Sequence, residues 1–171
     1  MSAAYTLEPL RESEIPEISR LARAIWRGHY TKIIGAAQVE YMLQNKYDSD
    51  DLKPYLSAYE RWFDVLRVNG ELAGFLRCSK HSPVALKLEE IYLASEHRGT
   101  GLGKALLLRA EALAHENGLG AVFLYVNRGN LNTVAAYRKS GFVVTESKVI
   151  DIGGGFVMDD YRMEKVLTPG Q

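Results

Sequence analysis

The chain has 171 residues and carries 21 Lys or Arg residues against 21 Asp or Glu residues, so its formal net charge at pH 7 is zero. An apolar content of 47% and a charged content of 25% are ordinary for a soluble globular protein. The length predicts one domain, residues 1–171, with a sizeable core. Because the charges balance, nothing in the whole chain argues for nucleic acid or an anionic membrane surface as a partner.

Cysteine usage and the start of the chain predict the compartment. Cys78 is the only cysteine, so no disulfide can form within the chain, which suits a reducing compartment. The start at Met1 shows neither a basic leader nor an apolar run, and no apolar stretch approaches membrane-spanning length. We therefore expect a cytoplasmic protein that does not insert into a membrane.

The N-terminal third predicts one strand and then helices. Residues 4–8 read as a strand. A helix running to about Arg27 follows from apolar side chains at helical spacing, namely Ile15, Ile18, Leu21, Ala22, Ile25 and Trp26. We expect residues 28–35 to be irregular, residues 36–45 to form a second helix and residues 50–59 to form a weaker third helix.

The middle of the chain predicts a hairpin followed by a further strand. Asn69-Gly70 is the strongest short hairpin signal, and it lies between strand-like residues 61–68 and 71–79. Gly74 marks a bulge in the second of these strands. Residues 85–94 predict the next strand, which leads directly into a glycine-rich loop.

This loop, residues 98–103, predicts an anion site. Gly99, Gly101 and Gly103 remove side chains where a ligand would meet the backbone, and a helix that opens at Leu102 presents its N-terminus to the same place. Arg98 and Lys104 add positive charge at both ends of the loop. Strand, glycine loop and helix together therefore predict a phosphate or pyrophosphate site.

Two familiar phosphate loops do not fit these residues. A P-loop requires Gly at position 98 and Ser or Thr at position 105, where the chain has Arg98 and Ala105. A dinucleotide fingerprint that starts at Gly99 or Gly101 fails at its last position. The pattern that does fit is Arg-Gly-x-Gly-x-Gly after a strand.

The C-terminal third predicts a buried strand, a helix and a strand pair. Residues 121–126 form a continuous apolar run, which is typical of a strand buried on both faces with a parallel neighbour. Asn130 is expected to cap a helix that ends at Gly141. Strands are expected over residues 143–150 and 156–166, with a loop at 151–155 and a loose tail at 168–171. Asp159-Asp160 reads either as solvated charge or as a site that attracts a cationic substrate.

These two stretches resemble the GCN5-related N-acetyltransferase (GNAT) superfamily. Residues 98–103 match its motif A, Arg/Gln-x-x-Gly-x-Gly/Ala, at every defining position. The later stretch is similar to motif B, Asn-x-x-Ala-x-x-x-Tyr-x-x-x-Gly-Phe, through Asn130, Asn132, Ala135 or Ala136, Tyr137, Gly141 and Phe142. The resemblance is specific over residues 88–142 and general over the rest.

The resemblance implies an α/β fold of the GNAT type: a mixed, mostly antiparallel seven-stranded sheet with a central parallel strand pair and helices on both faces. It also implies acetyl-CoA as cosubstrate and no metal. The expected coenzyme contacts are Ile91, Tyr92, Leu93, Arg98, Gly99, Thr100, Gly101, Leu102, Gly103, Lys104, Asn132 and Tyr137. Among them, the backbone N–H near Leu93 would polarise the thioester carbonyl, and Tyr137 would act as general acid beside the sulfur.

The acceptor side is predicted less sharply. On the resemblance, substrate contacts are expected at Trp26, His29, Tyr30 and Tyr41. Glu89 and Glu90 lie in the strand before the loop, where alternation places them on opposite faces. Glu90 is the candidate general base, acting through water, although many members of this superfamily use ordered waters instead.

The leading hypothesis is an N-acetyltransferase that acts on a primary amine of a small molecule. Residues 26–43 loosely resemble a bacterial subgroup that includes polyamine acetyltransferases. Alternative acceptors are a protein N-terminus, a lysine side chain, an aminoglycoside or an amino acid. The rival of another class is a non-catalytic coenzyme A-binding regulatory module, and the failed motifs disfavour a nucleotide-binding protein. Dimers are common in this superfamily, so a homodimer is one expectation.

Overall fold

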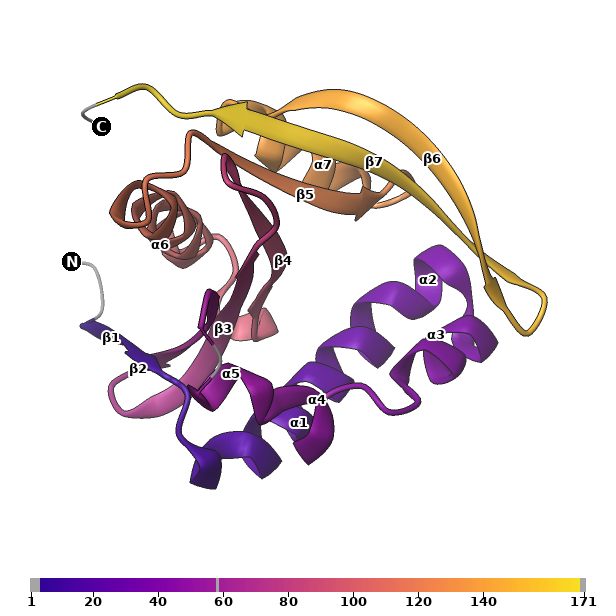
Figure 1. Ribbon diagram of the computed structural model, residues 1–171. Helices are drawn as coiled ribbons and strands as arrows, with labels where there is room; N and C mark the ends of the chain where they lie inside the picture. The colour runs from indigo at the N-terminus through magenta and orange to yellow at the C-terminus, as the bar shows by residue number, and fades with distance from the viewer. Residues whose placement is uncertain (1–3, 58, 170–171) are drawn as a thin grey trace.

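The computed structural model describes residues 4–57 and 59–169 (Figure 1). Within these residues seven strands form one sheet, in the spatial order β1-β2-β3-β4-β5-β7-β6. The strands are β1 (Tyr5–Pro9), β2 (Arg61–Val68), β3 (Glu71–Lys80), β4 (Ala85–Leu93), β5 (Ala121–Asn127), β6 (Val143–Gly153) and β7 (Phe156–Val166). β4 and β5 pair in parallel and the other neighbours pair antiparallel, which confirms the predicted mixed sheet with a central parallel pair.

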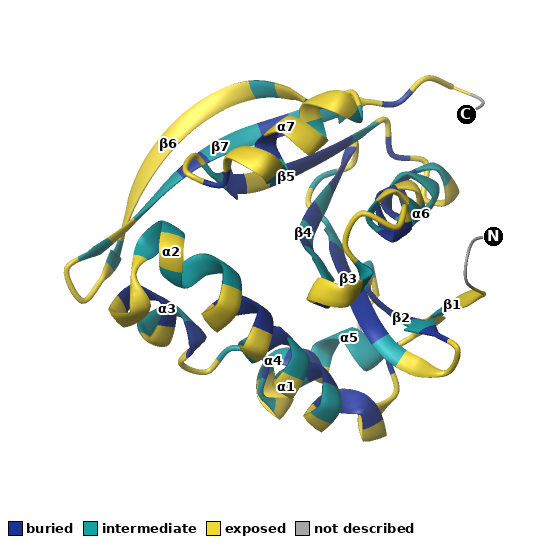
Figure 2. Ribbon diagram, turned by 180° about the vertical axis from the view of Figure 1, so that it is seen from behind, coloured by how far each residue is buried: buried dark blue, intermediate teal, exposed yellow. Residues whose placement is uncertain are grey.

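Helices cover both faces of this sheet, as predicted (Figures 1 and 2). One face carries α6 (Leu102–Glu116) and α7 (Leu131–Lys139), and the other carries α1 (Ile15–Ile25), α3 (Ala36–Leu43) and α4 (Ser49–Leu52). Each face buries its own apolar cluster, so the sheet separates two cores. In the part of the chain that is described, no helix is long and apolar enough to cross a membrane.

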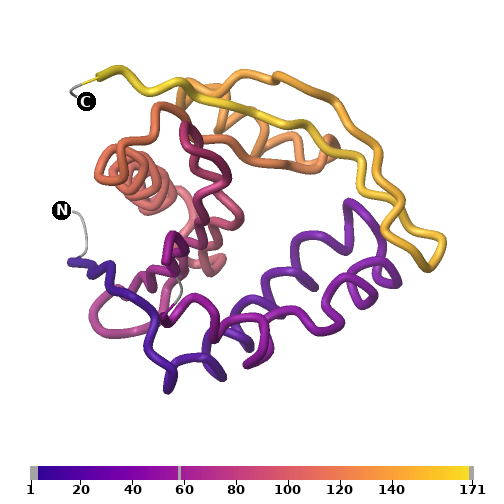
Figure 3. Tube along the Cα trace, viewed as in Figure 1, coloured from indigo at the N-terminus to yellow at the C-terminus, as the bar shows by residue number. Residues whose placement is uncertain are grey.

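The parallel pair is short, and this opens the centre of the molecule. β4 and β5 pair only over Ala85–Lys87 and Ala121–Phe123. Beyond these residues the two strands diverge (Figures 1 and 3). The facing edges of the two strands past this point therefore lack the backbone partners that a continuous sheet would give them.

β4 also contains a bulge, at Glu89. In the β3–β4 register Arg77 pairs with Glu90, whereas Cys78 pairs with Leu88, so Glu89 is an extra residue. The expectation that Glu89 and Glu90 lie on opposite faces is therefore wrong. Both carboxylates approach Arg77, with Glu89 Oε2 3.5 Å from Nε and Glu90 Oε2 3.8 Å from Nη1.

The N-terminal helices differ from the prediction in two places. Residues 28–35 are not irregular, because α1 continues through a π-helical turn, Trp26–Tyr30, into α2 (Thr31–Ile34). Such a turn inserts a residue into a helix without breaking it, and π-turns are frequent at functional sites. The helix expected at 50–59 is divided into α4 and α5 (Pro54–Ser57), since Pro54 has no N–H to continue α4.

The C-terminal hairpin is longer than predicted and packs on α3. The loop expected at 151–155 shrinks to a turn at Gly154-Gly155, because β6 extends to Gly153. The Tyr41 hydroxyl donates to the Ile152 carbonyl at 2.8 Å, and Gln38 Nε2 donates to the Val157 carbonyl at 2.6 Å. These bonds tie the N-terminal helices to the hairpin, which lie side by side in Figures 1 and 3.

Local turn chemistry was predicted correctly in the β2–β3 hairpin. Asn69 and Gly70 have φ values of 51° and 83°, the pair of positive angles that a type I′ turn needs. In the β2–β3 register Leu66 pairs with Gly74 and Arg67 with Leu72, which places the predicted bulge beside Gly74. Gly74 also lies against β4, where an added Cβ would clash with the Tyr92 carbonyl oxygen and lie 3.3 Å from Leu93 Cα.

We therefore predict that Gly74→Ala destabilises the protein by about 1–3 kcal/mol or more, because backbone of β4 cannot move aside cheaply. For a chain of this size each kcal/mol lowers the melting temperature by about 2–4 °C, which differential scanning calorimetry resolves.

Gly28→Ala is the matched control. Gly28 lies inside the π-helical turn and an added Cβ there meets nothing within 4 Å. Removing a helical glycine should raise stability by about 1 kcal/mol. Equal melting temperatures for the wild type and Gly74→Ala would contradict the close approach of β3 and β4.

Candidate active site

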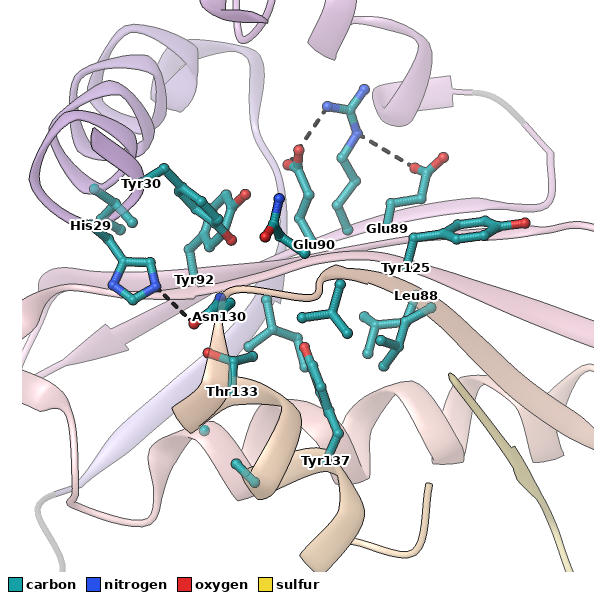
Figure 4. A pocket seen from close by; sticks show the side chains of 18 of the residues that line it. His29, Tyr30, Leu88, Glu89, Glu90, Tyr92, Tyr125, Asn130, Thr133 and Tyr137 are labelled. Atoms are coloured by element: carbon teal, nitrogen blue, oxygen red, sulfur yellow. Dashed lines mark hydrogen bonds and ion pairs between the residues drawn. The ribbon is translucent and has the colours of Figure 1, made fainter. Parts of the chain in front are cut away.

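A cavity of about 1760 Å³ lies where β4 and β5 separate. Its wall combines residues of the glycine loop, α6 and α7 on one face of the sheet with residues of α1, α3 and β7 on the other. Figure 4 shows this arrangement: Tyr137 and Thr133 extend from α7 on one side of the strands, and Tyr30, Tyr92 and Glu90 lie on the other side. The cavity therefore connects the two faces of the sheet.

The glycine loop forms the end of the cavity on the α6 side. Gly99 and Gly101 have φ values of 73° and 88°, which L side chains rarely adopt. An added Cβ at either position would meet nothing within 4 Å, so the backbone of the loop is open to a ligand. The N–H groups of the first turn of α6 have no partner within the helix. The loop therefore fits a pyrophosphate, with Arg98 and Lys104 in the same cavity wall.

Two expected loop contacts turn their side chains elsewhere. The Thr100 hydroxyl donates to the His97 carbonyl at 2.5 Å, and Leu102 is buried in the core beneath α6. Neither residue is among those that line the cavity, whereas Gly99, Gly101 and Gly103 are. Thr100 and Leu102 thus present only backbone groups to a ligand at this loop.

The free edge of β4 leads from the loop to the centre of the sheet. Ile91, Tyr92 and Leu93 all line the cavity, as expected, and lie beyond the last residue that pairs with β5. Ile91 and Leu93 pack toward the α6 face, while Tyr92 packs toward the N-terminal helices. An extended ligand can therefore hydrogen-bond to this edge as a strand would.

α7 supplies Tyr137 and Asn132 to the same side. Tyr137 is half-buried, packs against Phe142 with ring centroids 5.7 Å apart, and lines the cavity together with Asn132. Burial raises the pKa of the Tyr137 hydroxyl above its ordinary value, with the nearby Tyr30 and Cys78 adding to the effect. The phenol consequently stays protonated at neutral pH and is a proton donor.

The opposite side of the cavity is walled by aromatic rings. Trp26 and Tyr30 pack with ring centroids 4.6 Å apart, and Tyr92 meets both rings edge-on. Trp26 Nε1 donates to the Tyr47 hydroxyl at 2.7 Å, which in turn donates to Glu90 Oε1 at 2.9 Å. Trp26 and Tyr30 thus lie where substrate contacts were expected, and Tyr47 holds Glu90 although the sequence did not single it out.

His29 also lines the cavity, and its position depends on Asn130. His29 Nε2 donates to the side-chain oxygen of Asn130 at 3.1 Å, across the gap between the π-helical turn and the start of α7 (Figure 4). Asn130 is the N-cap residue of α7, as predicted, but its side chain makes no capping bond. Tyr41, by contrast, is not among the lining residues, because its ring packs on the β6–β7 hairpin beside Phe156.

The acceptor side contains four carboxylates, and three of them have cationic partners. Glu90 Oε1 forms an ion pair with Lys46 Nζ at 2.8 Å, and Asp51 Oδ1 forms one with Arg77 Nη2 at 2.7 Å. Glu89 approaches Arg77 and also accepts from the Tyr55 hydroxyl. The fourth is Asp160 on β7, which lines the cavity and takes part in no ion pair within residues 4–57 and 59–169.

Asp160 is 4% exposed, and its Oδ1 has no hydrogen-bond partner in the part of the chain that the structure describes. Burial raises the pKa of Asp160 from 3.8 to about 6, and the neighbouring charge of Asp159 adds to this. Of the two sequence-based readings, solvated charge does not describe Asp160, which is buried. In the sequence, only the alternation of a strand distinguishes Asp160 from its half-buried neighbour Asp159.

Known proteins share these elements. Residues 20–142 match the sequence model of the Acetyltransferase (GNAT) family. Spermidine N(1)-acetyltransferase of Thermoplasma acidophilum is 26% identical over 157 residues, which cover 90% of this chain and 94% of that protein. Mycothiol acetyltransferase of Corynebacterium glutamicum is 43% identical over 83 residues, 47% of this chain, but the match spans only 27% of that protein.

The fold is also found in a solved structure. The PaiA N-acetyltransferase of Thermoplasma acidophilum in complex with coenzyme A superposes with a TM-score of 0.79 and 26% identity, over 95% of this chain and 99% of that one. This likeness confirms the predicted fold class, and the coenzyme A of that complex agrees with the predicted cosubstrate. The family match contains the free edge of β4, the glycine loop and Tyr137 together. The chain therefore belongs to the Acetyltransferase (GNAT) family.

Proposed function

We propose that this protein transfers an acetyl group from acetyl-CoA to a primary amine of a small molecule. The observation that carries the proposal is the cavity through the sheet, which joins a phosphate-binding loop on one face to an acidic chamber with aromatic walls on the other. A donor that enters from the α6 side and an acceptor that enters from the other side would meet where β4 and β5 separate.

Acetyl-CoA supplies the acetyl group as a thioester when it is bound. The residues of this chain would hold it in two places: the glycine loop and the N-terminus of α6 bind the pyrophosphate, and the free edge of β4 binds the arm. The N–H near Leu93 would polarise the thioester carbonyl, an oxyanion-type role. Asn132, in the cavity wall, adds a side-chain contact.

Tyr137 is the proposed general acid. Its raised pKa keeps the phenol protonated, and from its place in the cavity wall on the α6 side it would reach the arm of the proposed coenzyme. A phenol so placed gives its proton to the departing sulfur, which stabilises the leaving group as the bond breaks.

Three observations favour a small cationic acceptor. The chamber holds Glu90 and Asp160, and carboxylates attract ammonium groups. The bonds of Tyr41 and Gln38 tie the N-terminal helices to the β6–β7 hairpin on the acceptor side, and this link would restrict access for a polypeptide. One relative that this chain matches over most of both lengths is named for spermidine, a small polyamine.

The first prediction concerns Tyr137→Phe. Removing a general acid should lower kcat by about 10²-fold or more and leave the KM for acetyl-CoA close to that of the wild type. The measurement is acetyl-CoA-dependent thiol release with polyamines, amino acids, aminoglycosides and lysine or N-terminal peptides as acceptors.

Tyr161→Phe is the matched control, because Tyr161 packs against the same core but is not among the cavity-lining residues. It should keep the wild-type rate. An undiminished rate in Tyr137→Phe would remove Tyr137 from the mechanism. Release with peptides alone would identify a protein acetyltransferase, and coenzyme binding without release from any acceptor would favour a regulatory module.

The second prediction concerns Gly101→Ala. A side chain at φ 88° costs about 1–2 kcal/mol and displaces the loop that is proposed to hold the pyrophosphate. Coenzyme A binding, measured by isothermal titration calorimetry, should weaken by about 10-fold.

Gly118→Ala provides the control at the other end of α6, since Gly118 also has a positive φ, of 68°. This variant should lose stability while it keeps the wild-type affinity for coenzyme A. If both variants bind coenzyme A equally well, the phosphate site does not lie at residues 98–103.

A further inference from the structure

We propose that Asp160 accepts the proton that the acceptor ammonium must lose before its nitrogen attacks the acetyl group. This inference rests on the proposed function and assigns its missing proton acceptor. The sequence had suggested Glu90 for this role, whereas the contacts in the cavity favour the carboxylate on β7.

The position of Asp160 places it on the acceptor side of the opening. Asp160 pairs in register with Asn127, the last residue of β5, at the end where β5 has diverged from β4. Asn127 and Asp160 both line the cavity. Tyr30, in the aromatic wall, lines the same cavity as Asp160 and Tyr137.

Asp160 is also the carboxylate of the chamber that is left for an external partner. Glu90 Oε1 already receives both Lys46 and the Tyr47 hydroxyl. Its Oε2 makes no hydrogen bond among the described residues either, but it lies 3.8 Å from the cationic Arg77 Nη1, whereas Asp160 has no such cation. Asp160 is 4% exposed, with Oδ1 unpartnered among the described residues. A buried carboxylate without a cation is costly unless a ligand brings one, and an ammonium group does so.

Titratable and polar groups from several elements surround the Asp160 carboxylate. Asp159 precedes it on β7 and pairs with Arg128, while Lys148 stands opposite on β6 but makes no ion pair with Asp160 in the described chain. The further groups that share the cavity are Asn127 on β5 and Tyr30, His29, Glu90 and Arg98. Burial is the largest influence, and it raises the pKa of Asp160 to about 6.

This environment suits proton transfer from an ammonium group. An amine with a pKa near 10.4 is neutral in only about one molecule in a thousand at pH 7. A rise from 3.8 to about 6 increases the proton affinity of the carboxylate by about a hundredfold, which narrows the gap to the ammonium. The group is still mostly ionised at neutral pH and therefore ready to accept.

The atoms and charges balance. One N–H bond of the ammonium breaks, its proton goes to the Asp160 carboxylate, and the electron pair stays on the nitrogen. The nitrogen then forms the bond to the acetyl carbon as the carbon–sulfur bond breaks, and it loses a second proton to solvent while the sulfur gains one from Tyr137. Tyr137 recovers a proton from solvent and Asp160 releases its own, so one proton is produced in each turnover.

The first arm of the test compares two acceptors. Wild type and Asp160→Asn are assayed with an alkylamine that the wild type acetylates, spermidine being the first one tried, and with a fluorinated analogue whose amine is already neutral at the assay pH. Asp160→Asn should lose about 10²-fold or more in kcat with the alkylamine. It should lose less than about 10-fold with the neutral analogue, which has no ammonium proton to lose before its nitrogen attacks.

The second arm measures the proton directly. Carbon-13 NMR of the aspartate carboxyl groups, in protein without acceptor, should show one signal that titrates near pH 6 and is absent from Asp160→Asn. In Asp159→Asn this midpoint should move to lower pH, because the neighbouring negative charge is gone. The acid limb of kcat/KM should move with it, since activity rises as Asp160 loses its proton.

Each outcome decides the proposal. Equal losses with both acceptors would make Asp160 a structural residue, and an acid limb abolished by Glu90→Gln but retained in Asp160→Asn would assign the base to Glu90. If no aspartate carboxyl signal of the wild type titrates near pH 6, the inference is overturned, even if Asp160→Asn fails to fold. If the wild type acetylates no amine at all, the proposed function itself fails. If the wild type acetylates an amine and Asp160→Asn has the same turnover rate, only the inference about Asp160 fails.

Discussion

The early separation of β4 from β5 is the constraint on which the rest of the structure depends. The two strands share only three register pairs, Ala85–Lys87 with Ala121–Phe123, before they diverge. A buried strand edge without partners is costly, so the edge must be filled by water or by a ligand that hydrogen-bonds like a strand. The glycine loop follows directly from β4, and α7 follows from β5. The separation of β4 from β5 therefore sets the positions of both the glycine loop and α7, the two ends of the proposed coenzyme site.

On the face of the sheet that carries the N-terminal helices, the structure holds negative charge near the gap between β4 and β5. The bulge at Glu89 lets two successive carboxylates approach Arg77, and Lys46 with Tyr47 fixes Glu90. A buried ion pair is weak evidence for stability but it orients its members. The network thus keeps the wall of the acceptor chamber in one arrangement, while Asp160 on β7 stays outside it.

Features governed by local backbone chemistry could be predicted from the sequence. Asn69-Gly70 requires positive φ angles whatever surrounds it, and Gly99 and Gly101 do the same in the loop. The motif around Tyr137 likewise indicated the family and with it the mixed sheet with its central parallel pair. By contrast, Tyr47 is distant from Glu90 in the sequence, and their contact depends on how α3 and α4 pack on the sheet.

Some predictions failed or were incomplete for physical reasons that lie outside a single segment. Alternation misplaced Glu89 and Glu90, since a bulge is a property of two paired strands and not of one. Asn130 is the N-cap residue of α7, as expected, but its side chain makes no capping bond, and His29, from the far side of the cavity, takes its side-chain oxygen instead. The raised pKa of Asp160 could not be predicted from the sequence either, because its burial comes from elements that meet only in the folded chain.

The same physical effect, burial, gives the two proposed proton-transfer groups opposite roles. Loss of water favours the neutral form of both, so Tyr137 is kept as an acid and the Asp160 carboxylate becomes a stronger proton acceptor. They lie on opposite sides of the opening, one with the coenzyme loop and one with the aromatic chamber. Protons would leave the acceptor on one face of the sheet and reach the sulfur on the other. The divergence of β4 and β5 then does two things: it makes room for the reacting atoms and it keeps the acid and the base apart, so that neither neutralises the other before the substrates are in place.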